Sequence, residues 1–167
     1  MEIIKIFGDN YFGKWEHIRT ACRAAVIRDG KLLLSYETAT DTWMIPGGGL
    51  EPGENEIQCC VRETAEETGF IIQPSPCVLE TDEYYEDCKY ISMYFFGTII
   101  GQCERKLTQR EKQTGMEPRW LCPQEALSIF SRHASYAAED EMKRGLYLRE
   151  YTALCALIKE QPKLPDA

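Results

Sequence analysis

Three glutamates, Glu63, Glu66 and Glu67, fall within a single predicted helical turn of this sequence. On an α-helix, positions i, i+3 and i+4 share a face, so the three carboxylates are expected to project in the same direction. A like-charged pair at this spacing costs roughly 0.2 to 0.5 kcal/mol on an exposed helix. A divalent cation would turn this repulsion into attraction, and carboxylate oxygens suit Mg²⁺ or Mn²⁺. The turn therefore predicts a metal site, with a solvated acidic helix face as the alternative.

The residues around this turn form a longer pattern over residues 48–70, GGLEPGENEIQCCVRETAEETGF. Gly48 is followed after five residues by Glu54, and after seven more by Arg62 and the sequence ETAEETGF. This spacing resembles the Nudix box, G-x5-E-x7-R-E-U-x-E-E-x-G-U, where U is a bulky apolar residue. Every fixed position matches. Thr64 and Phe70 depart from an aliphatic residue at the two U positions, and these departures concern packing rather than chemistry.

The resemblance implies an α/β protein with the Nudix fold, an α/β/α sandwich with a mixed sheet and a loop–helix–loop catalytic motif. It also implies metal-dependent hydrolysis of the diphosphate linkage in a nucleoside diphosphate linked to another moiety, such as a nucleotide sugar, a dinucleoside polyphosphate or a nucleoside triphosphate. The expected cofactor is Mg²⁺, with Mn²⁺ as a substitute. The competing hypothesis is a Nudix-fold module that binds or senses a nucleotide without hydrolysis. The three closely spaced carboxylates favour the enzyme hypothesis. A site that no longer catalyses a reaction would have no physical reason to keep like charges together.

By the same resemblance, Glu63, Glu66 and Glu67 are the catalytic, metal-binding glutamates, and one of them can also orient or deprotonate water. The backbone carbonyl of Gly48 is a further expected ligand. Glu54 and Arg62 are expected to brace the loop against the helix so that the ligands point correctly. A plain surface ion pair, worth about 0 to 1 kcal/mol, is the alternative for that pair.

Members of the family often recruit another glutamate from downstream of the box as a base or ligand. Glu111 and Glu117 lie nearest the expected position, Glu104 is a third candidate, and the sequence does not choose among them. For substrate binding, Arg23 could contact phosphate. Trp43, Tyr84 and Tyr85 could stack on a base, although packing in the core is the commoner role of a single aromatic residue.

Composition bounds the class of protein. The chain has 167 residues, 44% of them hydrophobic, which predicts a single domain over residues 1–167. Its net charge of −8 disfavours a nucleic acid polymer as partner and leaves a small-molecule nucleotide. No basic, apolar leader or membrane-spanning stretch is visible, and the eight cysteines lack CxxC spacing, so we expect reduced thiols and a cytoplasmic location. A homodimer using residues 1–6 as an edge strand is left open.

The helix that carries the glutamates is predicted to begin after the N-cap Asn55, with Gln58 completing a capping box, and to end at a left-handed Gly69. Apolar runs at 21–27 and 31–36 flank Asp29-Gly30 and predict a hairpin. Residues 105–112 are predicted to form a solvated loop, with a phosphate contact as the alternative. Further strands are expected at 70–72, 77–82, 89–100 and 119–121, and helices at 123–130 and 142–160.

Overall fold

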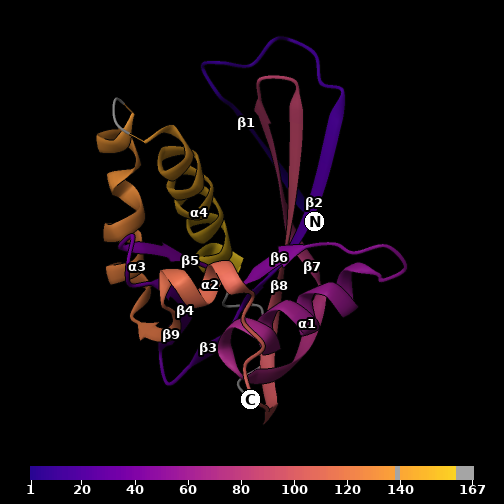
Figure 1. The fold of residues 1–167 in the computed structure, drawn as a ribbon, viewed down its shortest axis with the longest axis vertical. Coiled ribbons are helices and arrows are strands. Elements are labelled where there is room, and N and C mark those ends of the chain that lie inside the picture. The colour runs from indigo at the N-terminus through magenta and orange to yellow at the C-terminus, as the bar shows by residue number, and fades with distance from the viewer. Residues whose placement is uncertain (138–139, 161–167) are drawn as a thin grey trace.

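The computed structural model describes residues 1–137 and 140–160 and contains two sheets (Figure 1). The five-stranded sheet has the order β1-β7-β8-β2-β6, built from β1 (Glu2–Phe7), β2 (His17–Ala25), β6 (Gly47–Gly49), β7 (Phe70–Tyr85) and β8 (Cys88–Gln102). The pairs β1–β7 and β2–β8 are parallel, whereas β7–β8 and β2–β6 are antiparallel. In the second sheet β4 (Lys31–Glu37) pairs with β3 (Ile27–Arg28), β5 (Thr42–Met44) and β9 (Met116–Leu121).

Helices lie on both sides of these sheets. Helix α1 (Glu56–Thr68) packs against β2, β6 and β7, while α3 (Pro123–Phe130) packs against β4, and α4 (Glu141–Glu160) against β5 and β7. Figure 1 shows α1 well separated from α3 and α4, with strands between them. The remaining helices are the short α2 (Gln109–Thr114) and the 3-10 helix η1 (Ser131–Tyr136). The predicted α/β/α sandwich with a mixed sheet is therefore confirmed.

Strand alternation divides the core between the two sides. In β2 and the residue after it, Cys22, Ala24 and Val26 face the cluster that contains Cys59 and Cys60 of α1. Ala25 faces the opposite cluster, which includes residues of α3 and α4. Successive side chains of a strand point to opposite faces of a sheet, so a continuous apolar run supplies both layers.

Buried ion pairs join α4 to the five-stranded sheet. Arg149 lies 2.7 Å from Glu150 and 3.8 Å from Glu83 on β7, while Arg23 on β2 lies 4.0 Å from Glu150. The Glu150 side chain is fully buried, and burial raises the pKa of Glu83 against the opposing charges of Arg149 and Arg23. We call these four residues the buried ion cluster. It contains as many guanidinium groups as carboxyl groups.

The helix that bears the glutamates begins and ends as predicted. The Asn55 side chain accepts a hydrogen bond from the Gln58 backbone N–H, the Gln58 side chain accepts one from Asn55, and both are 2.9 Å long. At the other end Gly69 has φ +78° and donates its N–H to the Ala65 carbonyl at 2.9 Å. The local signals therefore located this helix correctly.

The predicted hairpin is only partly right. Asp29 and Gly30 form its turn with φ of +52° and +72°, but β4 pairs there with the two-residue β3 rather than with the whole run 21–27. Most of that run belongs to β2, which ends at Ala25 and pairs with β8 in the other sheet. Because residues 22–26 are buried on both faces, their hydrophobicity does not mark the point where the chain passes between sheets. The loop predicted at 105–112 also proved wrong in part, since α2 begins within it.

Candidate active site

The glycine strand β6 brings backbone next to the carboxylates of α1. Gly47 pairs with Arg23 of β2 at φ +148°, and a Cβ there would lie 2.2 Å from the Cys22 carbonyl oxygen, so only glycine fits. A Cβ at Gly48 would lie 2.5 Å from the carboxylate of Glu63. Gly47 thus lets β6 lie close to β2, and Gly48 lets it lie close to Glu63 of α1.

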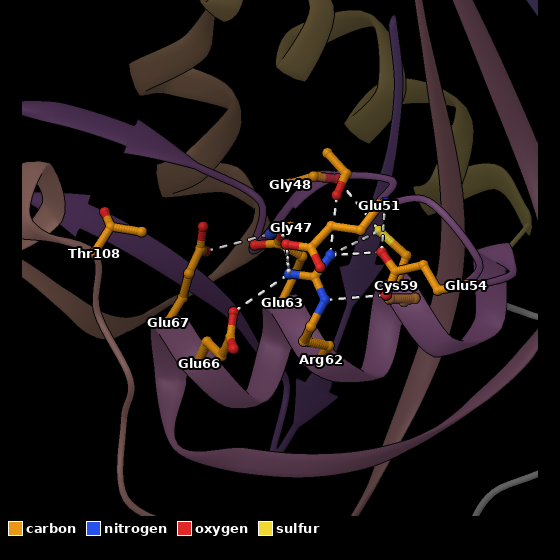
Figure 2. A network of polar contacts seen from close by, with 12 residues as sticks. Gly47, Gly48, Glu51, Glu54, Cys59, Arg62, Glu63, Glu66, Glu67 and Thr108 are labelled. Carbon is orange, nitrogen blue, oxygen red and sulfur yellow. Dashed lines mark hydrogen bonds and ion pairs between the residues drawn. The ribbon is translucent and has the colours of Figure 1, made fainter.

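Arg62 ties the loop, the helix and the glycine strand together (Figure 2). Its guanidinium donates to both carboxylate oxygens of Glu54, at 2.6 and 3.0 Å, and to the Gly49 carbonyl at 3.0 Å. It also donates to Glu63 at 2.7 Å and to Glu66 at 3.3 Å. Hydrogen bonding to Arg62 lowers the pKa of Glu54 to about 2. Arg62 therefore joins Glu54 of the loop to α1 and to the glycine strand, and the bracing role of this pair stays a prediction.

Glu67 is buried and turns away from Arg62 toward the glycine strand. Its carboxylate accepts hydrogen bonds from the Ser35 hydroxyl at 2.6 Å and from the Gly47 N–H at 3.3 Å. Burial raises its pKa to about 8, opposed by the Ser35 bond and reinforced by the charge of Glu63. Burial also raises the pKa of Glu63, against its bond to Arg62. Both carboxylates are therefore held where ionisation is costly without an added cation.

The donor chemistry of this face fits a hard divalent cation. The predicted ligands, three carboxylates and the Gly48 carbonyl, offer only oxygen, and Gly48 lies against Glu63. Within residues 1–137 and 140–160, no three Asp, Glu, His or Cys side chains converge as a ready-made cage. Glu63 and Glu66 instead face Arg62, and the Gly48 carbonyl accepts the Cys59 thiol at 3.5 Å. Each of these two carboxylates contacts Arg62 through one oxygen, so its second oxygen is not bonded to Arg62.

The two downstream glutamates lie in different settings. Glu111 caps the start of α2 through Thr108, and its negative charge contributes to the raised pKa of Glu63. Glu117 on β9 forms an ion pair with Arg119. The negative charge of Glu111 therefore acts on Glu63, on the acidic face of α1.

The predicted substrate contacts on β2 and β5 are engaged elsewhere. Arg23 is 8% exposed and donates to the Ile45 and Gly47 carbonyls, each at 3.3 Å. Trp43 is half-buried and stacks on Tyr36 with ring centroids 4.1 Å apart. Arg23 thereby fixes the backbone at the start of the glycine strand through hydrogen bonds.

The predicted substrate contacts on β7 face other neighbours. Tyr84 is buried and stacks on Phe7 at 4.8 Å, and Tyr85 is half-buried beside Gly145 of α4. Two strands, β8 and β2, separate β7 from β6. The structure therefore does not gather Arg23, Trp43, Tyr84 and Tyr85 into one pocket.

Two features of the site were missed from the sequence. Ser35 bonds Glu67, and its only signal was a hydroxyl at the end of the apolar run LLLS in β4. A hollow of about 540 Å³ also opens at Glu63. Besides Glu63, it is lined by Ile18, Arg19, Thr20, Gly49, Leu50 and Glu51. Its residues come from β2, from α1 and from residues 49–51, which we call the glycine loop, and these three parts are separated in sequence.

A family model of the NUDIX domain matches residues 18–142. The chain is 32% identical over 88 residues to the m7GpppN-mRNA hydrolase of Saccharomyces cerevisiae, covering 52% of this chain and only 8% of that protein. It is 28% identical over 126 residues to mouse diphosphoinositol polyphosphate phosphohydrolase 3-alpha, covering 74% of this chain and 75% of that one. A NUDIX hydrolase structure from Nitrosomonas europaea matches with a TM-score of 0.55 at 25% identity, covering 81% and 88% of the two chains.

No helix in the part of the chain that the structure describes is long and apolar enough to cross a membrane. The family model covers most of the chain and includes the glycine strand and the whole of α1. The box at residues 48–70 and the observed loop–helix–loop agree with that match. The chain therefore belongs to the Nudix hydrolase family.

Proposed function

We propose that this protein is a Mg²⁺-dependent hydrolase that cleaves the diphosphate linkage of a nucleoside diphosphate joined to another group. The observation that carries the proposal is the acidic face of α1, where Glu63 and the buried Glu67 stand against the glycine strand. Their raised pKa values mean that a bound cation would favour the ionised carboxylates. The divalent ion that the proposed reaction needs would thus offset the cost of ionising these two carboxylates.

Glu63, Glu66, Glu67 and the Gly48 carbonyl would hold the metal, Mg²⁺ or in its place Mn²⁺. When bound, the metal would neutralise phosphate oxygens and lower the pKa of a water. Arg62 and Glu54 keep the loop and the helix in register, and Ser35 with the Gly47 N–H fixes the direction of Glu67. Glu111 is the preferred candidate for an additional base, because its charge reaches Glu63.

The relatives support phosphate-linkage hydrolysis and leave the substrate open. Their names describe hydrolases of an mRNA cap and of a diphosphoinositol polyphosphate. The net charge of −8 favours a small nucleotide over a nucleic acid polymer, because an acidic surface repels a polyanion. We therefore propose nucleotide sugars, dinucleoside polyphosphates and nucleoside triphosphates as the substrates to test first.

A nucleotide panel with product identification tests the activity. The purified protein is incubated with each substrate class, with Mg²⁺ and with EDTA, and the released mononucleotides and phosphates are identified. We expect at least one class to be cleaved at a phosphoanhydride only when Mg²⁺ is present. Absence of turnover throughout the panel would favour the alternative, a nucleotide-sensing module, for which the occupation of Glu63 and Glu66 by Arg62 is the supporting observation.

Substitution of Glu67 tests the site itself. Glu67→Gln keeps the shape and can keep the Ser35 contact, but removes a charge from the proposed metal site. We expect kcat to fall by about 10²-fold or more with an unchanged circular dichroism spectrum. Glu56→Gln, on the first turn of the same helix, is the matched control and should stay close to wild type. Near-wild-type turnover by Glu67→Gln would contradict the proposed role.

A further inference from the structure

The hollow beside Glu63 contains one arginine, Arg19, that has no role in the proposed reaction. Arg19 of β2 lines it together with Glu63, Glu51 and the glycine loop. The side chain is exposed, and its Nη2 atom lies 3.3 Å from the position of a Cβ at Gly49. Arg19 therefore lies over the glycine strand, on the wall of a hollow that the acidic face of α1 also borders.

The ion pairs around the site single out this arginine. Arg62 has four carboxylates within 4.0 Å, including Glu51 and Glu63 of the hollow. Arg23 is buried and directed at backbone carbonyls and Glu150. Arg19 forms no ion pair within 4.0 Å with any side chain among residues 1–137 and 140–160. An exposed arginine without a counterion is thus available to an anion beside the proposed metal site.

Building on the proposed function, we propose that Arg19 binds a phosphate of the substrate that lies beyond the linkage being cleaved. A guanidinium presents paired N–H donors that match phosphate oxygens, which makes it the suitable side chain for this contact. The carboxylates of the hollow already face Arg62, so their charge is partly compensated before a substrate enters. The hollow would then accept a phosphorylated group in preference to a neutral sugar.

This contact selects a substrate class. Nucleoside triphosphates and dinucleoside polyphosphates carry a phosphate beyond the reacting pair, whereas a nucleotide sugar carries a sugar there. We expect the protein to favour the polyphosphates, and Arg19 to supply part of that preference. The scissile diphosphate is common to both classes, so a contact to it would not discriminate between them.

The test compares kcat and KM for a dinucleoside tetraphosphate and a nucleotide sugar in Mg²⁺. Arg19→Gln should raise KM for the tetraphosphate about tenfold, the cost of one charged hydrogen-bonded contact, with little change in kcat. KM for the nucleotide sugar should stay within about twofold of wild type, since that substrate offers no extra phosphate. Arg19→Lys, which keeps the charge, should recover part of the loss. Arg132→Gln on η1 is the matched control, an exposed arginine outside the hollow, and should behave as wild type.

An equal rise in KM for both substrates, or no rise for either, would overturn the proposal while leaving the hydrolase intact. Should the wild type hydrolyse neither of these substrates nor any other member of the nucleotide panel, the proposed function fails instead, and binding still decides the role of Arg19. Calorimetric titration with inorganic tripolyphosphate and Mg²⁺ should then show about tenfold weaker binding to Arg19→Gln than to wild type. Equal dissociation constants would reject the assignment of Arg19.

Discussion

Two groups of charged residues in this molecule are built on opposite plans. Around Arg62 one guanidinium faces four carboxylates, and the side chains are partly open to solvent. In the buried ion cluster, two guanidinium groups face two carboxyl groups, and the Arg149 and Glu83 side chains are 12% and 4% exposed. The first group has excess negative charge and access to solvent, whereas the second has neither.

This difference fits the ligand-binding role proposed for the first group and a structural role for the second. Charges removed from water require close partners, and the buried ion cluster provides them within the chain. The Arg62 group has four carboxylates for one guanidinium, and the proposed divalent ion would balance the remaining negative charge. Both groups contain acidic residues, and the balance and burial of charge distinguish them.

The largest expected effect concerns the stability of the buried ion cluster. Glu150→Ala leaves Arg149 and Arg23 without their shared carboxylate, and we expect a loss of about 3 to 5 kcal/mol in the free energy of unfolding. Glu66→Ala removes a half-exposed partner of Arg62 and should change stability by about 1 kcal/mol or less. Urea unfolding of both variants measures the contrast. Similar losses in the two would show that the groups do not differ as described.

A pH dependence follows from the pKa of Glu67, about 8 in the folded protein without metal. Between about pH 4.5 and 8 the unfolded chain releases this proton while the folded chain keeps it, so stability falls as the pH rises through that window. Glu67→Gln lacks this titration. Its free energy of unfolding relative to wild type should therefore rise by on the order of a few kcal/mol between about pH 5 and about pH 9.

Thermal unfolding in EDTA at the two pH values measures this gain. Excess Mg²⁺ should reduce the pH dependence of the wild type, because a bound cation favours the ionised carboxylate. A constant difference between wild type and Glu67→Gln across the range would mean that Glu67 ionises normally.

A smaller effect on stability is expected at the glycine strand. Gly48→Ala places a Cβ against the end of the flexible Glu63 side chain, so we expect a cost of about 1 kcal/mol or less but about tenfold weaker Mg²⁺ binding. Gly47→Ala is the comparison, because its Cβ would meet backbone atoms of Cys22 and Arg23. That variant should lose more stability. Unfolding and Mg²⁺ titration separate the two, and unaltered Mg²⁺ affinity in Gly48→Ala would argue against metal contact there.

Local chemistry made the acidic helix predictable from the sequence. The signals of Asn55, Gln58 and Gly69 act within a few residues, and the structure contains each of their hydrogen bonds. The resemblance to the Nudix box led us to expect Glu54 and Arg62 to act together, and in the structure Arg62 donates to Glu54 at 2.6 Å.

The partners that enclose the site were beyond sequence reasoning for a physical reason. Ser35 meets Glu67 across 32 positions of sequence, and Arg23 meets Glu150 of α4. Such pairs depend on strand order and register, which hydrophobic periodicity does not encode. The passage of the chain between sheets near Val26 was missed for the same reason.

The parallel pairing of β1 with β7 and of β2 with β8 has a consequence for how this protein is made. These ladders join Glu2 to Leu79 and His17 to Cys88, so neither can form until much of the chain has left the ribosome. High contact order of this kind slows folding. The acidic segment of α1 is therefore synthesised well before Glu150 of α4 can pair with Arg23 of β2.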